Sequence, residues 1–322
     1  MTVAATGLSA PAAAQYRKAI LAGVIGNVLE WYDFGVYGYL VPRRGFVGSW
    51  QLVGVGGGFL FGSLIAALLN TGLSQASRLA WGWRLPFLFG IAVGVVGLYL
   101  RWRLADTPKY TELEEQNAVA AAPLGEALRK YPRQTLLGFG VTVHNTVAYY
   151  IALVYMTNYM SSVGRVSQTT ALWIGTSCLA VFVLLLPAMG LLSDYLGRRP
   201  LLITSCIGYA VFGYPFFLMA TSGYLELAGV AQLLMVLFYV PYAGACPAFY
   251  AEIFPTRVRY TALSIGYNIA VALFGGFAPF IATLLIQVTG DKHAPAAYVV
   301  AAALVTLVIL LRTRETAFAP LR

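Results

Sequence analysis

The sequence predicts an all-α, polytopic membrane protein, on three observations. Apolar residues make up 59% of the chain and charged residues 10%, and soluble domains carry roughly 25% charged residues. Several apolar runs have the roughly 17 to 25 residues needed to cross a hydrocarbon core. The basic residues lie in short clusters between these runs, as cytoplasmic loops do. The net charge of +9 therefore indicates membrane topology, and no nucleic-acid partner is expected.

Nine apolar runs are candidates for membrane spans: 19–41, 50–70, 85–104, 135–158, 169–190, 201–220, 227–250, 261–287 and 296–311. Of the 21 Lys and Arg residues, 15 fall on the side reached after the odd-numbered runs, which places the C-terminus in the cytoplasm. The first run has basic pairs on both ends, Arg17 and Lys18 before it and Arg43 and Arg44 after it. Its orientation is therefore left open.

The first run contains ionisable residues near its middle. Asn27, Glu30 and Asp33 share one helix face, since they are spaced by three residues. A charged side chain at mid-membrane depth costs about 2.5–3.5 kcal/mol, so such residues usually face a cavity, a partner or a transported ion. We predict a proton-coupling or substrate role for these three. In the alternative interpretation, the surrounding aromatic residues form an interfacial belt and the carboxylates contact water at a helix end.

The second run repeats a small residue every four positions, at Gly54, Gly58, Gly62 and Ala66. Such a stripe lets another helix backbone approach closely, so it predicts a packing face. The Gly-rich start of the run does not indicate dinucleotide binding, because no strand precedes it.

The longest polar segment, 105–134, predicts the domain organisation. It is expected to be a cytoplasmic linker between an incomplete helical bundle at 1–104 and a six-helix bundle with a cytoplasmic tail at 135–322. The cysteines lie singly within apolar runs, without metal-ligand spacing, and are interpreted as core residues: Cys178, Cys206 and Cys246. No metal or cofactor is predicted.

The fourth run carries polar residues early in its length, His144 and Asn145, followed by Tyr149 and Tyr150. A hydrogen-bonded packing role is favoured for the first two. Asn145, Tyr149 and Tyr150 are nevertheless kept as candidates for substrate contact.

Residues 190–200 form a short basic turn with a defined pattern. Gly197 permits a tight bend, Asp194 and Arg198 can pair at i,i+4, and Arg199 is expected to anchor the cytoplasmic face. With Gly190 at its start, the turn resembles the G-x-L-x-D-x-x-G-R-R-P loop of the major facilitator superfamily.

Further segments, 26–40, 43–51, 81–87 and 254–260, resemble the metabolite:proton symporter family within that superfamily. The last of these contains Arg257 and Arg259, and Glu252 beside it is expected to pair with a basic residue at the cytoplasmic face. The resemblance implies a multi-pass transporter of the cytoplasmic (inner) membrane, not an enzyme. It implies alternating access around a central site, with protons and a small metabolite such as proline, betaine, ketoglutarate, citrate or shikimate as partners.

The chain departs from the family pattern in its first half. The family has twelve spans and a first copy of the loop between its second and third, and neither that copy nor its flanking helices are found here. Segment 43–51 resembles the entrance to the fifth span, yet it follows directly on the end of the first. Three helices are therefore expected to be missing, which explains the basic pairs on both sides of the first run.

The function predicted is a proton-coupled symporter working by alternating access. No Lys or Arg lies deep in any run, whereas tyrosines are plentiful, and aromatic faces suit quaternary ammonium groups. A proline or betaine type of substrate is therefore favoured. Because a central site needs both halves around it, the chain is expected to transport poorly, and an inactive remnant is the main alternative, with a channel as another. An enzyme is disfavoured because the loops offer no nucleophile or metal-binding motif.

Overall fold

The computed structural model describes residues 43–103, 129, 131–254 and 256–318, and every regular element in these ranges is helical. Seven helical stretches of the described chain are long and apolar enough to cross a membrane, and α15 is a shorter apolar helix. Together they correspond to eight of the nine predicted runs. The first run, 19–41, lies outside the described residues. The all-α membrane fold predicted from composition is confirmed.

The elements follow one another in a simple order: α3 (Arg44–Gly72), α4 (Gln75–Ala80), η1 (Gly82–Arg84), α5 (Leu85–Arg103), α8 (Pro132–Tyr149), η2 (Tyr150–Tyr155), α9 (Met156–Ser162), α10 (Gln168–Leu196), α11 (Arg198–Ala220), α12 (Leu225–Ile253), α13 (Thr256–Ala270), η3 (Val271–Gly276), α14 (Ala278–Thr289) and α15 (Pro295–Leu311). Helix α8 begins three residues before the predicted run, because Pro132 occupies its first turn, where the missing N–H is not needed.

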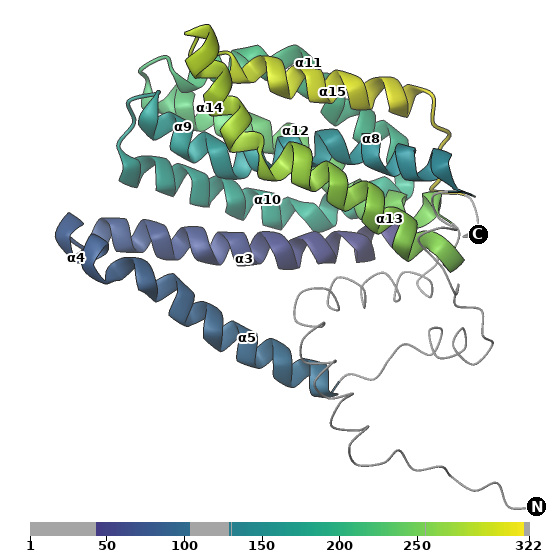
Figure 1. The fold of residues 1–322 in the computed structure, drawn as a ribbon, viewed down its shortest axis with the longest axis horizontal. Coiled ribbons are helices and arrows are strands. Elements are labelled where there is room, and N and C mark those ends of the chain that lie inside the picture. The colour runs from purple at the N-terminus through teal and green to yellow at the C-terminus, as the bar shows by residue number, and fades with distance from the viewer. Residues whose placement is uncertain (1–42, 104–128, 130, 255, 319–322) are drawn as a thin grey trace, which may run out of the picture.

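The helices from α8 to α15 pack into one bundle (Figure 1). Helix α8 packs on α13 and α15, α11 packs on α12 and α15, and α10 packs on α12. The core of this bundle is a single cluster of buried apolar side chains. Helix α12 is buried along most of its second half, from Tyr239 to Ala251.

Helix α3 lies lengthwise on α10, while α5 diverges from both (Figure 1). At one end of this contact Trp173 donates a hydrogen bond to Thr71 (3.1 Å). Further along, the hydroxyls of Ser63 and Thr176 are hydrogen-bonded at 2.7 Å. Helix α3 thus packs on α10 and α12 across the length of the bundle rather than only at its end.

The predicted packing stripe of α3 is open in the described part of the chain. A Cβ added at Gly54, Gly58 or Gly62 would meet nothing there within 4 Å. The buried small residues of α3 are instead Gly45, Gly48, Ser49, Gly56 and Ala67. Small residues cover two sides of this helix, so close packing on α10 was possible on either side. The sequence pattern did not show which side α10 occupies.

Two long runs contain a wider, π-helical turn. In the fourth run η2 follows α8, and Gln232 of α12 donates to the carbonyl of Ala152 in η2 (2.9 Å). In the eighth run η3 follows α13, and the hydroxyl of Tyr298 donates to the carbonyl of Phe274 (2.6 Å). In an apolar surrounding a displaced carbonyl needs another donor. Side chains from neighbouring helices therefore stabilise both π-helical turns.

Candidate functional site

The loop between α10 and α11 is a single residue, Gly197. Its φ of 96° lies in the region that favours glycine, and an added Cβ would lie 2.5 Å from a carboxylate oxygen of Glu315. A larger residue would be both strained and crowded. The predicted tight bend is therefore confirmed, and it brings the end of α10 and the start of α11 together.

Asp194 caps the first turn of α3 from another helix. Its Oδ1 accepts a hydrogen bond from the N–H of Gly45 (2.7 Å), and its Oδ2 accepts one from the N–H of Phe46 (2.9 Å). The N-cap residue of α3, Arg43, makes no side-chain cap of its own. A carboxylate is favourable there because the N–H groups and the helix dipole are positive.

Gly45 allows this close approach. A Cβ at Gly45 would overlap Ser193 and the carbonyl of Gly190, and one at Gly190 would overlap Gly45 in turn. The first turn of α3 and the last turns of α10 therefore pack backbone against backbone. The role of Gly190, which the sequence placed only in a loop pattern, is to permit this contact.

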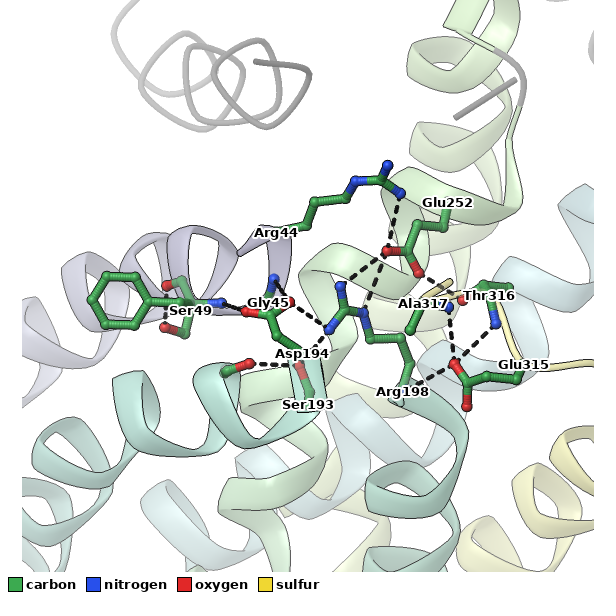
Figure 2. Close-up of polar contacts among 12 residues, drawn as sticks. Arg44, Gly45, Ser49, Ser193, Asp194, Arg198, Glu252, Glu315, Thr316 and Ala317 are labelled. Carbon is green, nitrogen blue, oxygen red and sulfur yellow. Dashed lines mark hydrogen bonds and ion pairs between the residues drawn. The ribbon is translucent and has the colours of Figure 1, made fainter. Parts of the chain in front are cut away.

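Arg198 lies at the centre of the charges, and only 2% of its surface is exposed. It donates to Asp194 at 2.8 Å, to the hydroxyl of Ser193 at 2.9 Å and to Glu252 of α12 at 3.1 Å (Figure 2). Arg44 of α3 forms a further ion pair with Glu252 (3.7 Å). The predicted pairs of Asp194 with Arg198 and of Glu252 with a basic residue are both confirmed.

The segment after α15 closes the same site. The hydroxyl of Thr316 donates to Glu252 (2.6 Å). Glu315 accepts from the N–H group of Arg198 (2.9 Å; Figure 2). It also accepts from the N–H group of Arg199 (3.0 Å), and so caps α11. We call Arg44, Asp194, Arg198, Glu252 and Glu315 the charged cluster.

The pKa of Glu315 reflects two opposing causes. Burial by itself raises the pKa of this carboxyl, whereas hydrogen bonds from the N–H groups of Ala317, Arg198, Arg199 and Thr316 lower it. The hydrogen bonds prevail, and the pKa lies below its ordinary value. Glu315 is therefore held as a carboxylate at neutral pH.

Arg199 contacts the end of α15. Its guanidinium donates to the carbonyls of Leu310 and Leu311, both at 3.0 Å. It thereby caps the C-terminal end of α15, where a positive charge is favourable. The side chain thus acts as a helix cap, and its predicted anchoring at the cytoplasmic face stays a prediction.

A second group of polar and aromatic residues lies midway along the contact between α3 and the bundle. The hydroxyl of Tyr239 donates to Asn145 (3.0 Å). The ring of Tyr149 lies edge-on to Phe59 of α3 (5.5 Å between centroids) and to Tyr239 (6.3 Å), and Phe182 of α10 stacks on Tyr239 (5.6 Å). We call Phe59, Tyr149, Phe182 and Tyr239 the aromatic cluster.

Within this group the Tyr149 hydroxyl is buried and has no hydrogen-bond partner among the described residues. Tyr150, half-buried, lies edge-on to the Tyr149 ring at 5.6 Å. Asn145, Tyr149 and Tyr150 are therefore brought together, beside an aromatic residue of α3. A buried hydroxyl without a partner is uncommon, and it marks a place where a polar ligand group would be stabilised.

His144 belongs to the core. It is fully buried, its Nε2 is hydrogen-bonded to the hydroxyl of Ser205 (3.0 Å), and its ring lies between those of Tyr209 and Tyr242. These contacts join α8 to α11 and α12. The packing role favoured for His144 is consistent with them.

Other predicted site residues cannot be placed. Asn27, Glu30 and Asp33 lie outside the described residues. Arg257 and Arg259 lie on the backbone of α13, but their side chains fall outside the description.

Several site residues were missed in the sequence. Ser193 and Glu315 had no recognisable pattern, and Phe59 and Phe182 were indistinguishable from other aromatic residues in apolar runs. For Arg44 the sequence offered a signal of a role in the site, because a basic residue stands just before an apolar run, but Arg44 was interpreted as part of a loop.

The fold and the capped loop define the class of protein: a helical membrane protein of the major facilitator type. The structure is similar to that of the major facilitator superfamily proton:xylose symporter XylE, with a TM-score of 0.67 and 15% identity, covering 88% of this chain and 67% of that one. At this identity the likeness shows the fold alone.

The chain belongs to the sugar (and other) transporter family, whose model matches residues 41–130 and 112–322. It is 32% identical over 289 residues to a proline/betaine transporter of Escherichia coli (strain K12). It is equally similar to the glycine betaine/proline/ectoine/pipecolic acid transporter OusA of Dickeya dadantii (strain 3937). Both matches cover 87% of this chain but 58% of the relative. The chain thus spans less than two thirds of these relatives' length.

Proposed function

We propose that the protein is a proton-coupled secondary active transporter of a small metabolite of the proline or betaine type, working by alternating access. The observation that carries this proposal is the contact between α3 and α10. It has a charged cluster at one end and, midway, an aromatic cluster with an unpartnered phenol. A gate and a binding site along one helix contact are what alternating access requires. The similar proteins are a proline/betaine transporter, a glycine betaine/proline/ectoine/pipecolic acid transporter and a proton:xylose symporter, which supports this substrate class and proton coupling.

The proposed organisation follows the sequence prediction. Residues 1–104 form an incomplete N-terminal bundle, 105–134 a linker and 135–322 the six-helix bundle with its tail. The chain lies in the cytoplasmic membrane. Its charged cluster and C-terminus face the cytoplasm, because the basic clusters of the sequence gather on that side.

The aromatic cluster is proposed to contact the substrate. A quaternary or secondary ammonium group is attracted to the faces of aromatic rings, and four rings from α3, α8, α10 and α12 meet here. The unpartnered Tyr149 hydroxyl and the Asn145 amide are suited to the substrate carboxylate. Both candidates lie on α8, directly before the η2 turn.

Proton coupling is proposed for Asp33, with Glu30 and Asn27 on the same predicted helix face. Desolvation disfavours the charged form of a carboxylate, so a carboxyl within the membrane can exchange protons near neutral pH. The charged cluster is proposed as the cytoplasmic gate, together with Arg257 and Arg259.

The test is uptake of labelled glycine betaine and proline into proteoliposomes that contain the purified full chain, with and without an imposed pH gradient. Gradient-driven, saturable accumulation that Asp33→Asn abolishes is the expected result. Asp291→Asn is the control, because Asp291 is an exposed carboxylate outside the candidate site, with 53% of its side chain accessible. Uptake that only equilibrates would instead indicate a channel.

The binding site is tested separately. Tyr149→Phe removes only the hydroxyl, so it is expected to raise the KM while leaving the aromatic face in place. Tyr149→Ala is expected to reduce uptake further. Tyr214→Phe is the matched control, since Tyr214 is an exposed tyrosine (49%) away from the cluster. Equal effects of Tyr149→Phe and Tyr214→Phe would contradict the assignment.

One observation favours an inactive remnant as the second candidate. A Cβ added at Gly54, Gly58 or Gly62 of α3 would meet no atom of the described chain within 4 Å, although such a stripe suits close helix packing. A purified chain that folds, with the charged cluster intact, but accumulates neither substrate under a pH gradient would support this alternative.

A further inference from the structure

A cavity of about 880 Å³ lies at the end of the bundle that carries the charged cluster. Its walls come from the start of α8, the end of α12 and the segment that follows α15. The volume is within the range of small-molecule sites. Neither the proposed gate nor the aromatic cluster accounts for this cavity.

Three arginines line the cavity: Arg133 of α8, and Arg312 and Arg314 after α15. All three are exposed. Their side chains form no hydrogen bond or ion pair with another described residue. The cavity therefore presents guanidinium groups that have no carboxylate partner in the described chain.

The two carboxylates at the cavity wall do not compensate for this charge. Glu252 is paired with Arg198 and Arg44 and accepts from Thr316. Glu315 accepts from backbone N–H groups, among them those that begin α11. Both are therefore engaged elsewhere, and the cavity as a whole is positive.

The rest of the lining combines three uncharged polar residues, Gln134, Thr313 and Thr316, with five apolar ones, Leu136, Leu137, Ile253, Phe254 and Ile309. Of these, Leu136 is 67% exposed. Arginines beside apolar side chains at the end of membrane-spanning helices match the boundary between lipid headgroups and acyl chains. Basic pockets in this position suit anionic headgroups, and guanidinium groups suit phosphate oxygens, which they can bind in pairs.

We propose that this cavity is a binding site for a phosphate-bearing anion, held by Arg133, Arg312 and Arg314 beside the charged cluster. Two sources share this chemistry, the phosphodiester of an anionic phospholipid and a soluble phosphate. The proposal does not depend on transport activity, since it concerns binding alone.

The test is titration of the purified full chain in detergent with phosphatidylglycerol and, separately, with inorganic pyrophosphate, followed by native mass spectrometry. Phosphatidylcholine is the zwitterionic comparison. Phosphatidylglycerol is expected to bind more tightly than phosphatidylcholine. Each Arg→Gln substitution at the three positions is expected to weaken binding about fivefold, which corresponds to about 1 kcal/mol per arginine.

Controls separate the site from general surface charge. Arg43→Gln removes an exposed arginine that does not line the cavity, and it is expected to leave binding unchanged. Arg312→Lys keeps the charge and is expected to retain most of the affinity. Thermal unfolding of each variant checks that the fold is intact, which is expected because these side chains have no described partners.

The outcomes are distinct. Binding of phosphatidylglycerol that the Arg→Gln variants weaken assigns the site to a lipid headgroup. Binding of pyrophosphate with the same sensitivity, and none of phosphatidylglycerol, assigns it to a soluble phosphate. The proposal is overturned if neither anion binds the wild-type chain, or if Arg43→Gln weakens binding as much as the cavity variants do.

Discussion

Replacing Arg198 by leucine is expected to destabilise the protein strongly. The side chain holds two carboxylates that are themselves buried, with 5% of Asp194 and 2% of Glu252 exposed. Without the guanidinium, these carboxylates keep their desolvation cost and lose their strongest partner. Removing one partner of such a buried pair costs about 3–5 kcal/mol. Arg44 stays 3.7 Å from Glu252, so the lower half of that range is expected for Arg198→Leu.

The physical cause is tested by a second substitution. Glu252→Gln in the Arg198→Leu background removes one stranded charge, so the double variant is expected to regain stability relative to the sum of the single variants. Coupling energies between contacting residues are about 0.5–3 kcal/mol. The measurement is reversible unfolding in mixed micelles, followed by helical circular dichroism, with exposed Arg43→Leu as the control. Strictly additive losses, or a loss for Arg198→Leu no larger than that of the control, would refute the reasoning.

Three further predictions concern single residues. Gly197→Ala is expected to destabilise the protein by about 1–3 kcal/mol from backbone strain, and further through the collision of the new Cβ with Glu315. Its loss of stability should be larger than that of Gly223→Ala, because Gly223 also has a positive φ (86°) but open surroundings. Equal melting temperatures for the two variants would contradict this. The pKa of Glu315 is lower in the folded protein than in the unfolded chain. The stability that this carboxylate contributes is therefore fully present above its unfolded-state pKa, and it is lost as the pH falls through its folded-state pKa. The wild type should therefore show an acid-side loss of stability that Glu315→Gln lacks. Gly45→Ala is expected to separate α3 from α10 and lower the melting temperature, whereas Gly54→Ala, at an open helix position, should be neutral or stabilising by about 0.5–1 kcal/mol; the opposite order would be incompatible with the packing described.

The parts of the site that could be predicted are local in the sequence. Asp194 and Arg198 are four residues apart on one turn of chain, and Gly197 lies between them, so their pairing and the bend follow from spacing. Glu315 caps the same turn from 117 residues away. No pattern around Glu315 distinguishes it from another polar residue of a basic tail, so only the packing of α15 on α11 reveals its role.

The membrane spans in the described part of the chain could be predicted from the sequence, whereas the contacts between them could not. Membrane spans are set by apolar length, which the sequence contains directly. Contacts between spans are not set by an apolar face, because the lipid is as apolar as the partner helix. In α3 this left two small-residue sides, one through Gly54 and one through Gly56. Among the described residues, the side through Gly56 is packed, beside Val183 of α10, and a Cβ at Gly54 would meet nothing within 4 Å.

The charged cluster has a property that bears on the proposed gate. The N-terminus of α3 has no side-chain cap of its own and depends on Asp194 of α10. Separating α3 from α10 would therefore break two charge-assisted hydrogen bonds, each contributing about 1.5–3 kcal/mol, while water could replace them at the exposed helix end. Asp194 would not be left without a partner, because Arg198 follows it on the same side of the contact and pairs with it at 2.8 Å. Opening the cluster would thus break the two capping hydrogen bonds and the ion pair of Arg44 with Glu252, while Asp194 would keep Arg198. In a variant without Arg198, opening would instead leave Asp194 without any of these partners.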